Sequence, residues 1–233
     1  MQERLNLELS STDDLTKRAS SRGMSEKSLG IEEQSMRIIE SEVGPHQFSN
    51  DEWFIVKRVI HATADFDFAN SGKIVFSSNA IQQAFRVFNR QLKIVTDVEM
   101  VLAGVNKNSI RRIGIQAVCN ISNDQVIRDS RKSNQTRSAL AMRYAASDID
   151  SGIVIIGNAP TALYEIIKMT NAKLIKPALV IALPVGFVSA AASKDDLVKS
   201  GIEYVTNVGR KGGSSAVSSI INALMLLYLK TRT

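Results

Sequence analysis

Residues 58–68 carry the densest set of side chains that could do chemistry. The stretch holds an arginine, a histidine, a threonine and two carboxylates, namely Arg58, His61, Thr63, Asp65 and Asp67. Histidine can hold or release a proton near neutral pH, so this stretch outlines acid/base chemistry with His61 as the candidate titrating group. A single histidine without a Cys or His partner is more often a hydrogen-bonded structural residue. The spacing alone leaves both interpretations open.

A helix must position His61. Residues 51–60 mix apolar and charged side chains in the manner of a half-buried helix, and Asn50 or Asp51 is available as its cap. His61 then lies near the C-terminal end of that helix, where the carbonyl ends of the peptide dipoles favour positive charge. Asp65 and Asp67 either form the turn that follows the helix or orient His61.

The remainder of the chain predicts an α/β fold. Short runs rich in Val and Ile alternate with segments of helical pattern, which is typical of a parallel sheet covered on both faces. The predicted strands are residues 94–97, 115–121, 153–156, 179–183 and 204–208, and helices are predicted over residues 79–90, 135–146, 160–170, 194–199 and 214–230. We therefore expect a three-layer α/β/α architecture with a mainly parallel central sheet.

The length of 233 residues suits one large domain. Residues 1–28 are rich in Ser, Thr and charges without a sustained apolar period, so we predict a flexible N-terminal extension there. Residues 29–233 are predicted to form a single α/β domain. Near its start, a helix over residues 31–40 places Ser35 on an apolar face, with its hydroxyl pointing inward.

Loops after the predicted strands are candidate binding segments, because ligands of open parallel sheets bind at the carboxyl ends of the strands. These loops are residues 96–100, 157–161, 184–188 and 209–215, and we expect them to converge on one rim. Pro160 suits the first turn of a helix, and the free amides before it would suit a carboxylate or phosphate unless the segment is an ordinary turn. The glycine- and cation-rich loop 209–215 is either an anion cradle or an exposed solubilising loop.

Two further motifs have competing interpretations. Asp97 and Glu99 could act as acid/base groups or bind a metal, but carboxylate pairs without a nearby histidine are common on solvated turns, and we assign no metal. Thr136 is predicted to cap the next helix, while Arg137 could clamp a carboxylate with two hydrogen bonds. The chain contains no P-loop, no G-x-G-x-x-G after a strand and no G-x-S-x-G, so nucleotide binding and hydrolase chemistry have no specific support.

Composition narrows the class of partner. The chain has 29 Lys+Arg against 23 Asp+Glu, a net charge of +6, which favours acidic ligands. A polycarboxylate fits this excess better than nucleic acid, because no basic run or aromatic RNA motif focuses the charge. Cys119 is the single cysteine, and the apolar stretches are short and interrupted. We expect a cytoplasmic protein without a disulfide or a membrane anchor.

Taken together and in order, these motifs resemble the precorrin-8X methylmutase family, also called cobalt-precorrin-8 methylmutase. The resemblance runs from about Leu29 to the C-terminus. It rests on Ile60-His-Ala-Thr-Ala-Asp-Phe66, Thr96-Asp-Val-Glu-Met100, Thr136-Arg-Ser138, Gly157-Asn-Ala-Pro-Thr-Ala-Leu163, Pro184-Val-Gly-Phe-Val188 and Gly209-Arg-Lys-Gly-Gly-Ser214. The chain departs from the family at Ala64, where glycine is common, and at Met36, where an aromatic residue is common.

The resemblance implies an isomerase of cobalamin biosynthesis that needs no cofactor. Such an enzyme moves a methyl group between adjacent ring C carbons of precorrin-8X or cobalt-precorrin-8 and gives hydrogenobyrinate or cobyrinate. It implies a homodimer with sites near the subunit interface, and His61 as the catalytic proton donor. The substrate-binding residues that we carry over by motif position or charge are Ser35, Arg58, Thr63, Thr96, Arg137 and Lys211.

The residues agree with that chemistry. A methyl shift within a macrocycle needs no nucleophile and no metal, only a fixed substrate conformation and one proton donor. The peripheral carboxylates of a corrin suit a basic rim. A non-catalytic tetrapyrrole-binding or carrier homologue remains the alternative, and nucleic-acid binding is a more distant one.

Overall fold

The computed structural model describes residues 25–232, so the predicted extension over residues 1–28 falls almost wholly outside the described residues. The chain divides into two compact units, residues 1–46 and residues 47–233. The described part of the first unit is the helix α2 (Glu26–Val43), which Ser25 caps by accepting a hydrogen bond from the Ser28 amide. Ile31 and Ile38 are exposed whereas Ile39 is buried, so the predicted inward face of this helix is not uniformly buried.

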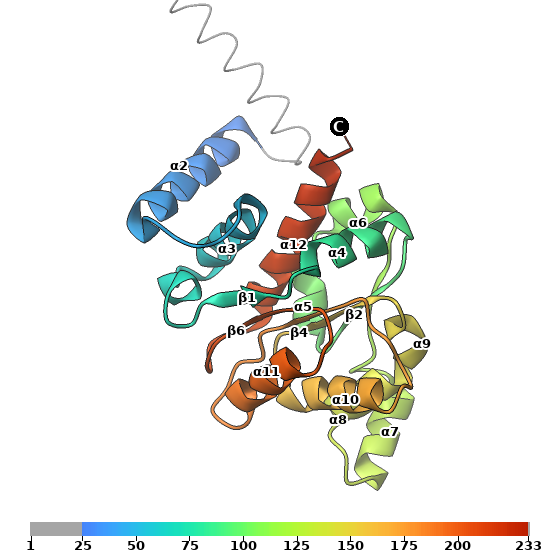
Figure 1. Ribbon diagram of the computed structural model, residues 1–233. Coiled ribbons are helices and arrows are strands. Elements are labelled where there is room, and N and C mark those ends of the chain that lie inside the picture. The colour runs from blue at the N-terminus through green and yellow to red at the C-terminus, as the bar shows by residue number, and fades with distance from the viewer. Residues whose placement is uncertain (1–24, 233) are drawn as a thin grey trace, which may run out of the picture. The chain divides into compact units, whose positions relative to one another are not determined.

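The second unit is built on a six-stranded sheet, in the order β1-β6-β5-β4-β2-β3 (Figure 1). The strands are β1 (Ile74–Phe76), β2 (Ile94–Thr96), β3 (Ala117–Cys119), β4 (Ile153–Ile156), β5 (Leu179–Ala182) and β6 (Tyr204–Asn207). β1 runs antiparallel to β6, and the other neighbours are parallel. The predicted mainly parallel sheet is confirmed. β1 was not predicted, although its Ile-Val-Phe sequence is as apolar as that of β2.

Helices cover both faces of this sheet (Figure 1). On one face α12 (Ser214–Lys230) packs against four helices, which are α3 (Asn50–Thr63), α4 (Ala80–Asn89), α5 (Glu99–Gly104) and α6 (Lys107–Ile113). The other face carries α7 (Asp124–Lys132), α8 (Arg137–Tyr144), α9 (Ala146–Ile149), α10 (Pro160–Asn171) and α11 (Ala190–Lys199). The predicted three-layer α/β/α architecture is confirmed.

The core follows from the alternation of side chains along buried strands. Val95, Val154 and Val180 point to the face where Leu163 and Ile166 of α10 pack. All residues of β4 and β5 are buried, which is why these strands appear in the sequence as unbroken apolar runs. Full burial of each such side chain stabilises the fold by about 1.5–3 kcal/mol.

Several element boundaries differ from the prediction. The helix before His61 is capped by Ser49, not by Asn50 or Asp51, and Ser49 forms a reciprocal capping box with Glu52. The helix α11 begins at Ala190, earlier than predicted, because its first residues resemble the apolar strand before it. Four short helices, α5, α6, α7 and α9, were not predicted, and none has more than nine residues. None of the described helices is long and apolar enough to cross a bilayer.

Candidate functional site

His61 lies in the last turn of α3, as predicted, and its side chain is exposed. The opposite face of α3 is fixed in the core by buried residues such as Val56 and Ile60. The helix ends at Ala64, which takes the left-handed conformation with φ of 53° and donates its amide hydrogen to the Ile60 carbonyl at 2.7 Å. The imidazole is therefore presented to solvent at the end of a firmly packed helix.

The other predicted residues of α3 are less exposed. Arg58 lies one turn before His61, is half-buried, and places its guanidinium 5.1 Å from the centre of the Phe54 ring. Thr63 donates its hydroxyl hydrogen to the Val59 carbonyl of the same helix at 2.8 Å. In this structure the Arg58 guanidinium therefore lies against the Phe54 ring, and the Thr63 hydroxyl is engaged with the backbone of its own helix.

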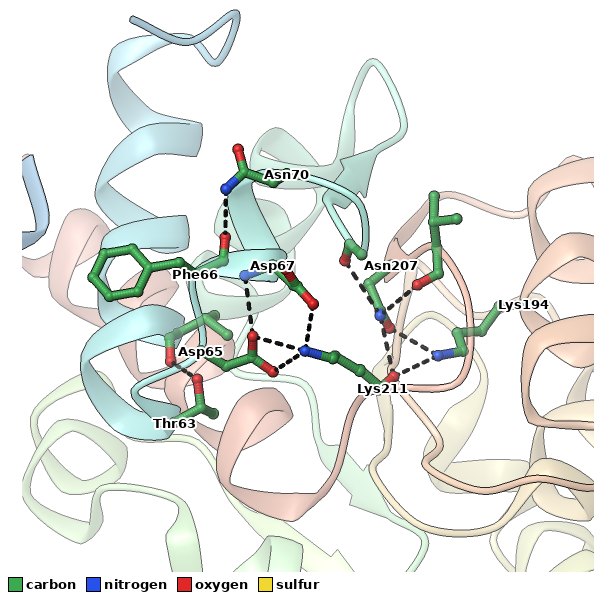
Figure 2. Close-up of polar contacts among 11 residues, drawn as sticks. Thr63, Asp65, Phe66, Asp67, Asn70, Lys194, Asn207 and Lys211 are labelled. Atoms are coloured by element: carbon green, nitrogen blue, oxygen red, sulfur yellow. Dashed lines mark hydrogen bonds and ion pairs between the residues drawn. The ribbon is translucent and has the colours of Figure 1, made fainter. Parts of the chain in front are cut away.

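Lys211 is paired with the segment that follows His61 (Figure 2). Its ammonium lies 2.8 Å from Asp65 Oδ2 and 2.5 Å from Asp67 Oδ2. These bonds raise the pKa of Lys211, and the same ammonium lowers the pKa of Asp67. Asp65 also accepts from the Asp67 amide at 3.0 Å, which closes the turn. The described contacts of both carboxylates therefore go to Lys211 and the turn, not to His61, and Lys211 is already engaged in this structure.

Asp97 occupies the amides that were predicted to receive a substrate anion. Its fully buried carboxylate accepts from the amides of Gly157, Asn158 and Ala159 at 3.1, 2.8 and 2.9 Å, at the start of α10. Burial raises the pKa of this carboxyl, and the three N–H donors oppose the rise. The prediction that these amides are free is wrong, because the chain supplies its own carboxylate. The same burial argues against Asp97 as a solvent-facing acid or base.

Thr96, a predicted substrate contact, is also fully buried. Its hydroxyl lies 3.4 Å from the carbonyls of Val98 and of Val118 on the neighbouring strand. In this structure the hydroxyl therefore supports the end of β2 and is not presented at the rim.

The loops after the strands do converge. The Gly213 amide donates to the Leu183 carbonyl at 2.9 Å, and the Gly186 amide donates to the Arg210 carbonyl at 3.3 Å, which joins the loops after β5 and β6. A Cβ on Gly157 would lie 3.0 Å from the Cα of Ser214, so the loop after β4 touches the start of α12. The predicted common rim at the carboxyl edge is confirmed.

Arg137 is held at this rim by a cluster of hydroxyls. Thr136 caps α8 as predicted by accepting from the Ala139 amide at 3.3 Å. The Thr136 hydroxyl donates to Thr161 Oγ1 at 3.0 Å, and Ser138 Oγ lies 2.9 Å from the same oxygen. The starts of α8 and α10 are therefore tied together, and the exposed Arg137 is the first residue of α8.

The start of α12 is the other candidate for anion binding. This 17-residue helix begins after Gly213, which provides no side-chain cap. Gly212 and Gly213 have φ of +156° and +116°, and a Cβ on Gly212 would lie 2.0 Å from the Leu183 carbonyl oxygen. Only glycine fits at Gly212, so the loop can press closely against β5 and direct the first amides of α12 towards the rim.

Two residues of the site were missed by sequence reasoning, Lys194 and Asn207. Both are buried, and both contact the backbone carbonyl of Lys211 (Figure 2). A carboxamide at the end of an otherwise apolar strand was the available signal for Asn207. Nothing in the sequence distinguished Lys194 from the exposed lysines of other helices.

Ser35 belongs to the first unit. Its hydroxyl donates to the Ile31 carbonyl of its own helix at 2.9 Å. Among the described residues, no group of three or more His, Cys, Asp or Glu is arranged to hold a metal ion.

A cavity of about 550 Å³ lies at the opposite edge of the sheet. Its lining includes Leu92, Ser151 and Ala178, which precede β2, β4 and β5, and it does not include His61. The lining cations are Arg86, Arg90 and Lys176. The carboxyl edge around His61 is a separate, solvent-facing surface.

Comparison with known proteins yields one family. The family model described as precorrin-8X methylmutase matches residues 30–227. The chain is 42% identical over 208 residues to the cobalt-precorrin-8 methylmutase of Leptospira interrogans, covering 86% of this chain and 94% of that protein. It is 43% identical over 197 residues to the protein of that name from Priestia megaterium, covering 84% and 87%. The solved structure of the precorrin-8X methyl mutase from Thermus thermophilus superposes with a TM-score of 0.81 at 34% identity, covering 87% of this chain and 97% of that one.

Proposed function

The chain belongs to the precorrin-8X methylmutase family, an isomerase family of cobalamin biosynthesis, and from this premise we propose its reaction and its catalytic residue. It moves a methyl group between adjacent ring C carbons of precorrin-8X or cobalt-precorrin-8, giving hydrogenobyrinate or cobyrinate. His61 donates the proton, or a hydrogen bond, to the ring nitrogen beside the migrating methyl group. The reaction takes place in the cytoplasm and without a cofactor.

The observation that carries this proposal is the exposed His61 at the end of α3, joined to the basic carboxyl rim through the turn at Asp65. A methyl shift redistributes charge over the macrocycle, and a proton donor held beside it lowers the barrier. Because α3 is packed along its other face, the backbone that carries His61 is held in place before substrate arrives.

The rim supplies partners for the peripheral carboxylates of such a substrate. Arg137 is exposed at the start of α8, and the first amides of α12 carry no side-chain cap. Arg58, one turn before His61 on the same helix, is kept as a proposed substrate contact. Thr63, Thr96 and Lys211 are kept as proposed substrate contacts on the strength of the family resemblance. In this structure the Thr63 hydroxyl bonds within α3, whereas Thr96 and Lys211 tie parts of the rim together. Ser35 is kept as a proposed substrate contact on the strength of the family resemblance.

A second subunit would complete the site. Phe187 and Val188 are 87% and 82% exposed in the loop after β5, on the same rim, and large exposed apolar side chains are typical of protein interfaces. We therefore keep the homodimer as part of the proposal, with corrin as the bound partner and with no role for nucleic acid or membrane.

The test is the conversion of precorrin-8X, followed by its absorption spectrum, for the wild-type chain and for His61→Ala. We expect His61→Ala to lower kcat by about 100-fold or more, since general acid catalysis contributes roughly 10²–10⁴-fold. The variant should keep its fold, because the side chain is exposed, and should still form a coloured complex with hydrogenobyrinate.

The matched control is His46→Ala, which removes the other histidine of the chain and should turn over at the wild-type rate. A His61→Ala variant with the wild-type rate would remove the proton-donor role. A wild-type chain that binds hydrogenobyrinate but never converts precorrin-8X would be the carrier homologue.

A further inference from the structure

A buried polar pair lies directly behind the glycine-rich loop of the rim. Lys194 on α11 and Asn207 at the end of β6 are 1% and 2% exposed. The Lys194 ammonium donates to Asn207 Oδ1 at 2.9 Å and to the Lys211 carbonyl at 2.7 Å (Figure 2). We refer to Lys194 and Asn207 as the buried hub.

Asn207 connects this hub to two loops. Its amide nitrogen lies 3.1 Å from the Lys211 carbonyl and 3.0 Å from the Val208 carbonyl, both on the loop after β6. The same nitrogen lies 3.4 Å from the carbonyl of Gly72, in the segment that follows His61. One side chain thus contacts the backbone of the glycine-rich loop and of the segment after the histidine helix.

The exposed side of Lys211 makes a second connection between the same two loops. Its ammonium binds Asp65 and Asp67, while the Asp67 carbonyl accepts from the Gly72 amide at 3.0 Å. Residues 65–72 are therefore attached to the glycine-rich loop at both ends, by the Lys211 side chain and by Asn207. The backbone of Lys211 lies between the two attachments, and Lys194 fixes that backbone.

The presence of an ammonium group in this position needs a reason beyond packing. The ammonium donates to a carboxamide oxygen and to a carbonyl, and the nearby charge of Asp195 on the same helix offsets only part of the cost of burial. Desolvation lowers the pKa of Lys194 to about 8, which shows that burial disfavours its charged form. A buried aliphatic side chain would avoid that cost.

We propose that Lys194 is a positioning residue, which with Asn207 holds the glycine-rich loop at residues 209–213 against the segment that follows His61. The expected effect of Lys194 on the reaction rests on the proposed function, whereas its expected effect on the two loops does not depend on that function. Without the ammonium, the Lys211 backbone loses its shortest hydrogen bond, so the Lys211 side chain and the start of α12 lose their common support.

The experiment compares Lys194→Met with Lys199→Met, the same change at an exposed position of the same helix. Amide hydrogen exchange should show faster exchange in residues 65–72 and 209–213 together in Lys194→Met, with the core of α12 unchanged as the internal reference. Turnover of precorrin-8X should fall by about 10- to 100-fold, because small misplacements of catalytic groups cost that much. Lys199→Met should match the wild type in both measurements.

A double variant separates positioning from general destabilisation. Because Lys194 supports both the Lys211 side chain and the start of α12, the turnover loss in Lys194→Met should be smaller when it is made in a Lys211→Met background. Additive losses together with faster exchange over the whole chain, and not in the two loops alone, would mean that Lys194 merely stabilises the fold, which overturns the proposal. Should Lys194→Met not fold, Lys194→Gln removes the charge and shortens the side chain by one atom while keeping amide N–H donors. Faster exchange in residues 65–72 and 209–213 is then expected of it, and unchanged exchange would overturn the proposal.

Two outcomes distinguish this inference from the proposed function. If the wild-type chain converts precorrin-8X while Lys194→Met retains wild-type exchange and turnover, the inference fails and the function stands. If the wild-type chain converts nothing but Lys194→Met loosens both loops together, the positioning role stands and the function fails.

Discussion

The titratable side chains at the carboxyl edge of the sheet have two kinds of role, and burial separates them. Asp97 and Lys194 are buried and bind backbone atoms of the loops at the carboxyl edge. His61 and Arg137 are exposed on or beside the same edge. The buried groups hold the loops of the rim in place, and the exposed side chains are accessible to a ligand. Asp97 shows how sequence reasoning can mistake one kind for the other, since only the fold reveals that its carboxylate is enclosed.

Asp97 should make stability depend on pH in the acid range. The pKa of Asp97 in the folded state is raised above the ordinary 3.8. At a pH between the unfolded-state pKa and the folded-state pKa, the folded chain therefore holds the proton more often than the unfolded chain does. Its contribution to stability is therefore fully present below the unfolded pKa and is lost as pH rises through the raised folded value. Asp97→Asn removes this titration and costs about 1–3 kcal/mol at neutral pH, because an amide nitrogen then faces backbone N–H donors.

The measurement is the free energy of unfolding in urea from about pH 3 to about pH 7. The stability gap between wild type and Asp97→Asn should widen towards acid. The control is Asp196→Asn on the exposed face of α11, and its difference from the wild type in the free energy of unfolding should stay the same across this pH range. A gap that narrows towards acid would show that the three backbone donors outweigh burial.

Elements that carry a long period or a strong end signal could be predicted from the sequence. The bounds of α12 and the start of α10 at Pro160 agree with the prediction, and so does the Thr136 cap. The short helices could not be predicted, because their few residues are held by tertiary contacts and not by local propensity. β1 has an apolar Ile-Val-Phe run like that of β2 and was missed. At the site, the convergence of the loops could be predicted from the parallel sheet. The sequence did not reveal that the Asp97 carboxylate already occupies the amides before α10.

The end of α3 contains a backbone conformation that its residue does not favour. Ala64 has φ of 53° and ψ of 30°, the left-handed region where a Cβ costs about 1–2 kcal/mol. Ala64→Gly removes that strain and loses about 0.5–1 kcal/mol through the greater freedom of the unfolded chain. We expect a net gain of roughly 0.5–1 kcal/mol in the free energy of unfolding, measured by urea or heat.

Ala62→Gly is the matched control for this change. Ala62 is exposed and lies inside the same helix, so the substitution should destabilise by about 1 kcal/mol. If Ala64→Gly destabilised as much as Ala62→Gly, the left-handed end of α3 would not exist in solution.

At the scale of the whole molecule, the two edges of the sheet offer different surfaces to an acidic ligand. The carboxyl edge carries His61 and Arg137, while the cavity at the amino edge is lined by Arg86, Arg90 and Lys176. Cationic side chains therefore lie at both edges of a chain whose net charge is +6. Charge alone therefore does not say where a polycarboxylate binds, and placing the substrate at the carboxyl edge rests on the proposed role of His61.

Salt can test that selection. A basic chain attracts a polycarboxylate over distances that ions screen, so kcat/KM for precorrin-8X should fall by about tenfold between low and high ionic strength, while kcat changes little.

Arg137→Ala should raise KM and make the salt dependence shallower, because it removes a cation from the proposed rim. Arg86→Ala removes one from the amino edge and should leave the slope as in the wild type. If Arg86→Ala flattened the slope and Arg137→Ala did not, the substrate would enter at the amino edge, and the site around His61 would have to be abandoned.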